Sequence, residues 1–408
     1  MRLTQRLSEE RGQTLIMFMV LFTVITIVGA VAVDVGLWLS ERRGAQTDAD
    51  LPALAGAAEL MIVDAGSAEA ASAVALAEDF LERNDESGNA SLSEPVLVDD
   101  SCFSSDPRDR PGVPDSVTVH VRHDTTTLFG QFFGLAVPDI GAHAKACAGS
   151  LRSTTGLRPW TISMYNSECF EWNDDGDGVK DYPEDEFLPW YGEDCVIRLE
   201  SPSSQVGSIR LGPDPGDECN EPSAGGAEKY KENILEGSDA WCEIDDLIDT
   251  EPGLKVGPTY DALEDLLASE GECDSEYCAD VSGGMCNGMD EFAESFTPAD
   301  IAPTHDDVYQ PNACTTPRAV DIVIIDEFTN PTGMSTVPIR GFAAFFIMQC
   351  EVIDPGTEEV LAVYPGCDVP PGDRSNSQIR GRFMQVLKLK GSGGPMDTFG
   401  TKTIFLVE

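Results

Sequence analysis

The segment "LIMFMVLFTVITIVGAVAV", residues 15–33, decides how this chain is built. It carries no charged side chain over nineteen residues, and a helix of that length spans about 28 Å at about 1.5 Å per residue. This length is close to the thickness of the hydrocarbon core of a membrane. The apolar region of a secretory signal peptide is shorter, at about 7 to 15 residues. We therefore expect a transmembrane helix over residues 15–39.

The orientation of this helix follows from the cysteines, because arginines stand on both sides of the apolar segment. All twelve cysteines lie beyond residue 100, and none is in a Cys-x-x-Cys pair. This pattern favours disulfides formed in an oxidising compartment over a zinc site, although the spacing leaves the pairing open. The sequence thus predicts a cytoplasmic stub over residues 1–14 and an extracytoplasmic remainder.

The residues that follow the span suit a continuation of the same helix. Residues 40–63, "SERRGAQTDADLPALAGAAELMIV", are rich in alanine and leucine, which are strong helix formers. Pro52 lies inside this stretch and is expected to kink the helix, because proline removes a backbone hydrogen bond.

Several short elements in and around the span carry a family resemblance. They are an Arg-Gly-Gln entry at 11–13, an Asp-Val-Gly at 34–36, the pair Arg42 and Arg43, and a run from Gln46 to Ala49 that opens an alanine-rich helix. With these elements, residues 10–60 resemble the N-terminal module of the TadE/TadG-like proteins of Flp-type (tight-adherence) pilus assembly. The resemblance implies a single-pass protein of the bacterial cell membrane whose partners are other pilus or secretion-system proteins.

The resemblance also implies a candidate processing site between Gly12 and Gln13. In pilin-like members of the family, a prepilin peptidase cuts after a glycine, and a glutamate follows five residues into the mature chain. Gly12 is in place, but Met17 occupies the position of the glutamate. Both a cleaved subunit and an uncleaved anchor therefore remain open.

A first folded unit is predicted over residues 40–153, with a long helix and a small sheet in a pilin-like arrangement. An amphipathic helix begins at Ser67, and residues 116–123 alternate as a strand with the valines at 117, 119 and 121 facing inward. His120 and His123 are three apart on this strand, so they face opposite sides and do not bind one metal together. Phe129, Phe132 and Phe133 form a stripe at helical spacing that is typical of a core.

Residues 157–408 read as a second, β-rich extracytoplasmic domain, which makes the whole chain an α+β protein. Short apolar runs alternate here with Gly, Pro and acidic turns. The motifs "RPW", "GSIRL" and "IRGRF" resemble extracytoplasmic regions that are joined to TadG-like N-termini. Helices are expected near 227–237 and 259–271, and strands at 195–200, 208–212, 320–328, 337–350, 378–389 and 402–408.

The stretch "NDDGDGVKDYPE", residues 173–184, has the spacing of a calcium-binding loop. An EF-hand loop supplies oxygens from positions 1, 3, 5, 7, 9 and 12 and has glycine at position 6, which here is Gly178. Lys180 and Pro183 depart from the pattern, which favours an isolated, EF-like loop between strands that stiffens the domain. The alternative is a solvated acidic turn. The candidate calcium ligands are Asn173, Asp175, Asp177, the carbonyl of Val179, Asp181 and Glu184.

Composition and motifs narrow the function. The net charge of −46 repels the phosphates of nucleic acid, so we expect no nucleic-acid partner. The chain has no G-x-S-x-G, H-E-x-x-H or phosphate-binding loop, and we expect no catalytic residues and no enzyme activity. The sequence identifies no surface ligand.

Three functions remain open at this point. The first is a non-catalytic subunit or assembly partner of a tight-adherence pilus or related secretion system. The second is a calcium-dependent surface adhesin or binding protein that uses a pilin-like membrane anchor. The third is an extracytoplasmic hydrolase without a recognisable motif.

Overall fold

The computed structural model is an α+β protein with one very long N-terminal helix and two main sheets. It describes residues 3–61, 66–85, 88–106, 109, 111–125, 127–133, 140–165, 169–173, 186–189, 194–198, 206–212, 218–220, 226–250, 256–268, 272–273, 314–315, 317–326, 335–384, 386–387, 392–395 and 401–407. The α-helices in these ranges are α1 (Leu3–Ala58), α2 (Ser67–Asn84), α3 (Ala227–Leu235) and α4 (Val256–Ala268). The short 3-10 helices are η1 (Gly130–Phe133) and η4 (Arg374–Asn376).

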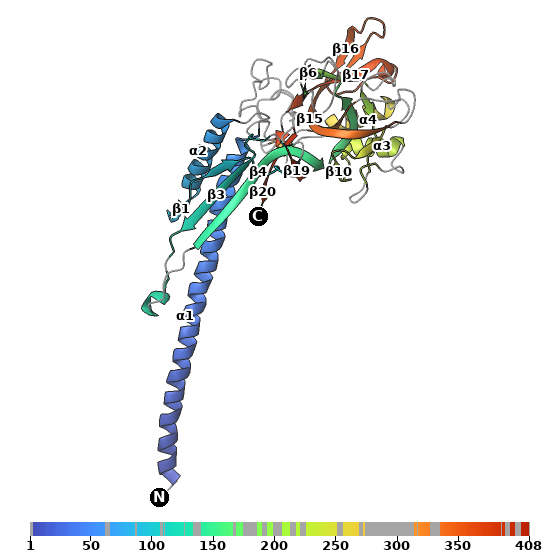
Figure 1. Ribbon diagram of the computed structural model, residues 1–408. Coiled ribbons are helices and arrows are strands. Elements are labelled where there is room, and N and C mark those ends of the chain that lie inside the picture. The colour runs from blue at the N-terminus through green and yellow to red at the C-terminus, as the bar shows by residue number, and fades with distance from the viewer. Residues whose placement is uncertain are drawn as a thin grey trace.

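Helix α1 extends from the body of the molecule as a rod whose first half contacts little else (Figure 1). It is the one helix among the described residues that is long and apolar enough to cross a membrane, and the most apolar part of the candidate span, which runs from Thr14 to Ala58, is not buried by the protein. The helix continues through Pro52 without a break in its assignment. The sequence prediction of an apolar helix extended by an alanine-rich segment is confirmed.

The second half of α1 packs on the first sheet and on α2. Alanines of α1 at four-residue spacing, which are Ala45, Ala49, Ala53 and Ala57, are fully buried. Ala49, Ala53 and Ala57 pack with valines of β3 and alanines of β4 and α2 in one cluster. The valines at 117, 119 and 121 face this core as predicted. Small residues on both sides let the helix and sheet approach closely.

The first sheet has the strand order β1-β3-β4-β20-β18, with β2 beside β3 and with β10 and β19 beside β4. Its central strand is β4, because β3 pairs with one edge of it and β20 with the other. The strands are β1 (Ala90–Leu92), β2 (Leu97–Asp99), β3 (Ser116–His123), β4 (Ile140–Thr154), β10 (Cys242–Glu243), β18 (Val386–Leu387), β19 (Ser392–Gly394) and β20 (Thr401–Val407).

The pairing of β20 with β4 joins the end of the second predicted unit to the sheet of the first. Lys402 lies opposite Ser150 and Val407 opposite Lys145 in an antiparallel register. The strand itself was predicted at 402–408, but it was assigned to the unit formed by residues 157–408. Strand β3 occupies one edge of β4, and the opposite edge also has backbone groups that need partners. The distant strand β20 supplies them for residues 145–150 of β4.

The second sheet has the strand order β8-β17-β15-β14-β5-β9, with β11 and β16 beside β15. Five of the six predicted strand segments overlap strands of this sheet, whereas the segment 402–408 forms β20 of the first sheet. The strands are β5 (Leu157–Ser163), β8 (Cys195–Arg198), β9 (Val206–Ser208), β11 (Leu247–Asp249), β14 (Ala319–Ile325), β15 (Thr336–Ile353), β16 (Val360–Tyr364) and β17 (Ser377–Met384). Two separate pairs complete the described strands: β6 (Phe170–Asn173) with β7 (Glu186–Pro189), and β12 (Glu272–Cys273) with β13 (Cys314–Thr315).

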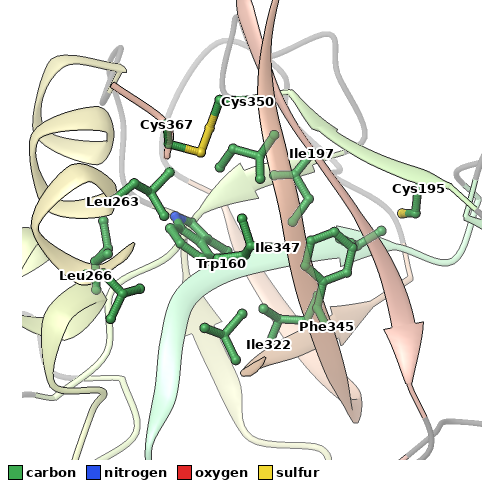
Figure 2. Packing of buried hydrophobic residues seen from close by; sticks show 14 of the residues in the cluster. Trp160, Cys195, Ile197, Leu263, Leu266, Ile322, Phe345, Ile347, Cys350 and Cys367 are labelled. Carbon is green, nitrogen blue, oxygen red and sulfur yellow. A yellow bond between two sulfur atoms is a disulfide. The ribbon is translucent and has the colours of Figure 1, made fainter. Parts of the chain in front are cut away.

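Large side chains fill the core between this sheet and helices α3 and α4. Figure 2 shows Trp160 of β5 lying between Leu263 and Leu266 of α4 and Ile347 of β15. The indole Nε1 of Trp160 donates a hydrogen bond to the Tyr230 hydroxyl at 2.9 Å, so the one polar atom of the ring is satisfied inside the core.

Four disulfides join described residues, and none of the described cysteines is free. Cys102–Cys147 ties the loop after β2 to β4 in the first sheet. The other three lie in the second unit and are Cys169–Cys195, Cys219–Cys242 and Cys350–Cys367. The expectation of disulfides, made without a pairing, is confirmed for these eight cysteines.

Candidate functional site: the junction between helix and sheet

Asp34 is the first charged residue after the apolar segment, and the fold buries it against a turn from the sheet. Its Oδ1 accepts hydrogen bonds from the backbone N–H of Leu128 at 2.9 Å and of Phe129 at 3.1 Å. Its Oδ2 accepts from Phe129 at 3.2 Å and from Gly130 at 2.7 Å. Successive N–H groups in a turn form a concave site for an anion. The carboxylate of the helix therefore fixes the turn between β3 and β4.

The turn reaches Asp34 because the connection from β3 runs along α1, away from the sheet (Figure 1). Gly130 is needed at the contact: an added Cβ would lie 3.2 Å from Thr127 Cβ and 3.3 Å from Asp34 Oδ2. Both distances are tighter than ordinary contacts, so a side chain at position 130 would push the turn away from the carboxylate.

A second polar contact holds α1 to the end of β3. The ring of His123 is buried, with Nε2 2.8 Å from Asp48 Oδ2 and Nδ1 3.3 Å from Glu41 Oε2. Asn89 Nδ2 donates to the same Glu41 oxygen at 3.2 Å. One histidine thus bridges two carboxylates that stand seven residues, or about two helical turns, apart on α1.

His120 lies on the opposite face of β3, where its ring stacks on His143 of β4 with 5.5 Å between centroids. The prediction that the two histidines face opposite sides of the strand is confirmed by this geometry. The sequence pattern missed the role of His123, since only the tertiary structure brings Glu41 and Asp48 beside it.

Gln46 makes the third polar contact between α1 and the sheet. Its Nε2 donates to the backbone oxygen of His143 at 3.2 Å and to Asp50 Oδ1 at 2.7 Å. Asp34, Gln46 and Asp48 are polar residues of the segment that carries the family resemblance, and Ala49 belongs to its buried alanine row. The motif residues therefore dock the helix onto the sheet, whereas Arg42 and Arg43 are exposed.

The predicted stripe of phenylalanines is not a core stripe throughout. Phe129 is 36% exposed and its neighbour Leu128 is 52% exposed, so the prediction is wrong for Phe129. The side chains of Phe132 and Phe133 lie outside the described residues. The spacing of apolar residues along the chain does not by itself say whether a side chain lies inside the protein or on its surface.

The calcium-binding loop falls almost wholly outside the described residues. Asn173 ends β6 and lies opposite Glu186, the first residue of β7, in an antiparallel pair. The flanking strands and the Cys169–Cys195 disulfide are thus described, whereas Asp175, Asp177, Val179, Asp181 and Glu184 are not. Within the described ranges, no group of three or more His, Cys, Asp or Glu side chains could hold a metal ion. The calcium site stays a prediction.

Gly12 and Gln13, the residues of the candidate processing site, lie within the first turns of α1. The backbone there is helical, and nothing in the structure bears on cleavage between them. Cleavage also stays a prediction.

Buried charges in the second unit are bonded within the fold. Burial by itself would raise the pKa of Glu351, but hydrogen bonds from Arg380, Gln378 and Gln349 together lower it. The Arg380 Nε lies 2.7 Å from Glu351 Oε1. Arg318 donates to the carbonyls of Ile347, Met348 and Pro365 at 2.9 to 3.0 Å, and burial lowers its pKa to about 10. These groups brace β14, β15 and β17.

A comparison with known protein families finds a match in helix α1, which carries the docking residues. Residues 12–59 match the family model described as "Putative Flp pilus-assembly TadE/G-like". Neither the curated proteins nor the solved structures gave a match. The matched residues lie within α1 and the turn after it, and they include Asp34, Gln46 and Asp48. The N-terminal segment of this chain is therefore similar to the TadE/G-like module of Flp pilus-assembly proteins.

Proposed function

We propose that the protein is a membrane-anchored, non-catalytic subunit or assembly partner of a Flp-type pilus or of a related secretion system. The observation that carries the proposal is the coincidence of three features on α1. The family match, the unburied apolar span and the polar contacts to the sheet all lie on this helix. The helix thus joins the membrane to the folded body through the residues that the family supplies.

In this proposal, α1 crosses the bacterial cell membrane at residues 15–39, with residues 1–14 in the cytoplasm. The units predicted at 40–153 and 157–408 stand outside, in the extracytoplasmic space. Four disulfides support this side, because disulfides persist in oxidising compartments. The protein works through contacts with other pilus or secretion-system proteins and catalyses no reaction.

We also propose that the loop at residues 173–184 binds a structural calcium ion. Its support is the ligand spacing in the sequence and the pairing of β6 with β7 on either side. A bound ion stabilises the folded state by RT ln(1 + [L]/Kd), or about 2.7 kcal/mol at 100 times Kd. Calcium should therefore raise the melting temperature of the full chain relative to chelator under oxidising conditions, and Asp175→Asn with Asp177→Asn should abolish the difference. Equal melting temperatures would refute the site.

A deletion strain tests the assembly role. Loss of the gene should remove Flp-type filaments from the cell surface, and the full chain should restore them. A chain in which residues 15–33 are replaced by an unrelated apolar helix of equal length serves as the matched control, since it keeps an anchor but loses the apolar part of the family segment. We expect this control to reach the membrane without restoring filaments.

The outcomes of this experiment separate the proposals. Normal filaments in the deletion strain would overturn the assembly role, and loss of calcium-dependent attachment in that strain would support the adhesin instead. Mass spectrometry of the mature N-terminus decides the form of the subunit: a chain that starts at Gln13 is processed as a pilin, and one that starts at Met1 is an uncleaved anchor.

A further inference from the structure

We propose that the turn at residues 127–131 is a second membrane contact, which inserts Leu128 and Phe129 into the interfacial layer of the phospholipid bilayer beside α1. The inference rests on the membrane anchoring in the proposed function. It adds a lipid-binding surface that belongs to the sheet unit and not to the helix.

The level of the turn along α1 is the first argument. Asp34 follows the uncharged segment directly, and its carboxylate is bonded to the backbone of Leu128, Phe129 and Gly130. The turn is therefore fixed within one helical turn of the edge of the hydrocarbon, where interfacial side chains gather in membrane proteins.

The exposed side chains of the turn are the second argument. Leu128 and Phe129 project large apolar groups outward, and the surface of α1 at the same level is also apolar and exposed. We call the exposed apolar side chains of the turn and of α1 at this level the apolar collar, and exposed apolar surface of this kind marks a contact site. The helix residues of the collar are Val33, Val35, Leu37 and Leu39.

Three successive backbone N–H groups of the turn are bonded inside the protein, which is the third argument, although the buried Thr127 hydroxyl has no hydrogen-bond partner. Three N–H groups donate to Asp34, and Gln131 Nε2 donates to the carbonyl of Leu128 at 3.3 Å. Unbonded backbone groups are costly in a low-dielectric layer. Here the N–H groups of Leu128, Phe129 and Gly130 bond inward to Asp34, and the side chains of Leu128 and Phe129 are exposed, as a segment that enters the interface requires.

The exposed arginines mark the outer, aqueous boundary of the membrane interface, as Asp34 marks its boundary with the hydrocarbon core. Arg42 and Arg43 stand eight and nine residues after Asp34, or about 12 to 14 Å farther along the helix axis. Both are exposed, and at that height they reach anionic head groups and water. The order of apolar span, apolar collar and basic pair is the order of layers in a bilayer. The turn therefore fixes the depth and the rotation of α1 in the membrane.

Photo-crosslinking in vesicles tests the contact directly. The full chain carries p-benzoyl-phenylalanine at position 129, at 22 or at 361 and is reconstituted in phosphatidylethanolamine and phosphatidylglycerol at three to one. Phe22 in the span and Leu361 on β16 are both 63% exposed, so they are matched positive and negative controls. We expect lipid adducts, read by mass spectrometry, at 22 and 129 and at most a tenth of that yield at 361.

Each outcome has a distinct meaning. Adducts at 22 without adducts at 129 would overturn the interfacial turn and leave the anchoring intact. Absence of adducts at 22 would overturn the anchoring on which the inference rests. Equal yields at 129 and 361 would show adventitious contact and would also overturn the turn.

A substitution at Asp34 tests the attachment of the turn to the helix. In Asp34→Asn, half of the carboxylate becomes a donor that faces the N–H groups of the turn, so the yield at 129 should fall several-fold while that at 22 stays constant. Asp79→Asn on α2 is the control, because Asp79 is exposed and pairs with Arg83 of its own helix. An unchanged yield at 129 in Asp34→Asn would refute the role of Asp34 in positioning the turn.

Discussion

The two units of the molecule solve the packing problem in opposite ways. The core under α1 consists mainly of alanines and valines, whereas the core under α3 and α4 contains Trp160, Tyr260, Phe345 and Phe383. Small side chains bury little area each, so the first core depends on close approach of helix and sheet. Large side chains bury more area each, so the stability of the second core depends on every aromatic ring being present. Opposite substitutions should therefore damage the two regions.

Truncating a ring in the second core should have the largest effect. Phe345 is fully buried and packs edge-on against Phe383 with 5.8 Å between centroids. Phe345→Ala should lower the free energy of unfolding by about 3–5 kcal/mol, measured by denaturant titration. Phe345→Leu, which leaves a smaller cavity, serves as the control. A loss below about 1 kcal/mol for Phe345→Ala would contradict the dependence on rings.

Removing a disulfide should have the next largest effect and compares the units directly. Cys102–Cys147 in the first unit closes a separation of 45 residues, and Cys350–Cys367 in the second closes 17. Paired replacement by serine should cost about 2–4 kcal/mol, and about 1 kcal/mol more for the longer loop, because a longer loop loses more entropy on closure. Thermal unfolding of the two variants measures the difference. An equal or reversed order would break this part of the comparison.

Enlarging a residue in the first core should cost less than either. Ala53→Leu places three further carbons where α1 meets the sheet, and such overpacking costs about 1–3 kcal/mol. Ala53 is fully buried. Thr47→Leu, on the exposed side of the same helix, should stay within about 0.5 kcal/mol. Denaturant titration measures the free energy of unfolding of both variants. If Ala53→Leu were as stable as Thr47→Leu, the helix would be free to move away from the sheet.

The smallest effect is a difference in pH dependence. The lowered pKa of Glu351 means that its contribution to stability is present above its ordinary value of 4.5 and is lost as the pH falls through the folded-state pKa. Burial raises the pKa of Asp115 in the first unit above 3.8, despite hydrogen bonds from the N–H of Cys102 and Phe103. The contribution of Asp115 is therefore lost as the pH rises.

Unfolding from pH 3 to 6 tests these opposite signs. The stability of the native chain relative to Glu351→Gln should grow with pH, and its stability relative to Asp115→Asn should shrink. Both replacements keep the size of the side chain and remove the titration. Slopes of the same sign would show that the two carboxylates have similar environments.

Local pattern predicted much of this fold. The long apolar helix, the inward valines of β3 and the positions of the six predicted strands follow from local spacing and composition, but the assignment of β20 to the second unit was wrong. The docking of α1 did not follow, because His123, Glu41 and Asp48 lie far apart in the sequence and only the tertiary structure joins them. The position of Phe129 was mistaken for a similar reason, since the spacing of apolar residues is the same for a core and for a lipid surface.

The pairing of β4 with β20 has a consequence for the order of events during synthesis. Ser150 and its partner Lys402 are 252 residues apart, and at about 5–20 residues per second the second strand follows the first by roughly 10–50 s. Throughout that interval one edge of β4 has open backbone groups, which can pair with any other extended chain. The first sheet is thus complete only after residues 401–407 have been synthesised, so its completion requires nearly all of the residues that separate β4 from β20.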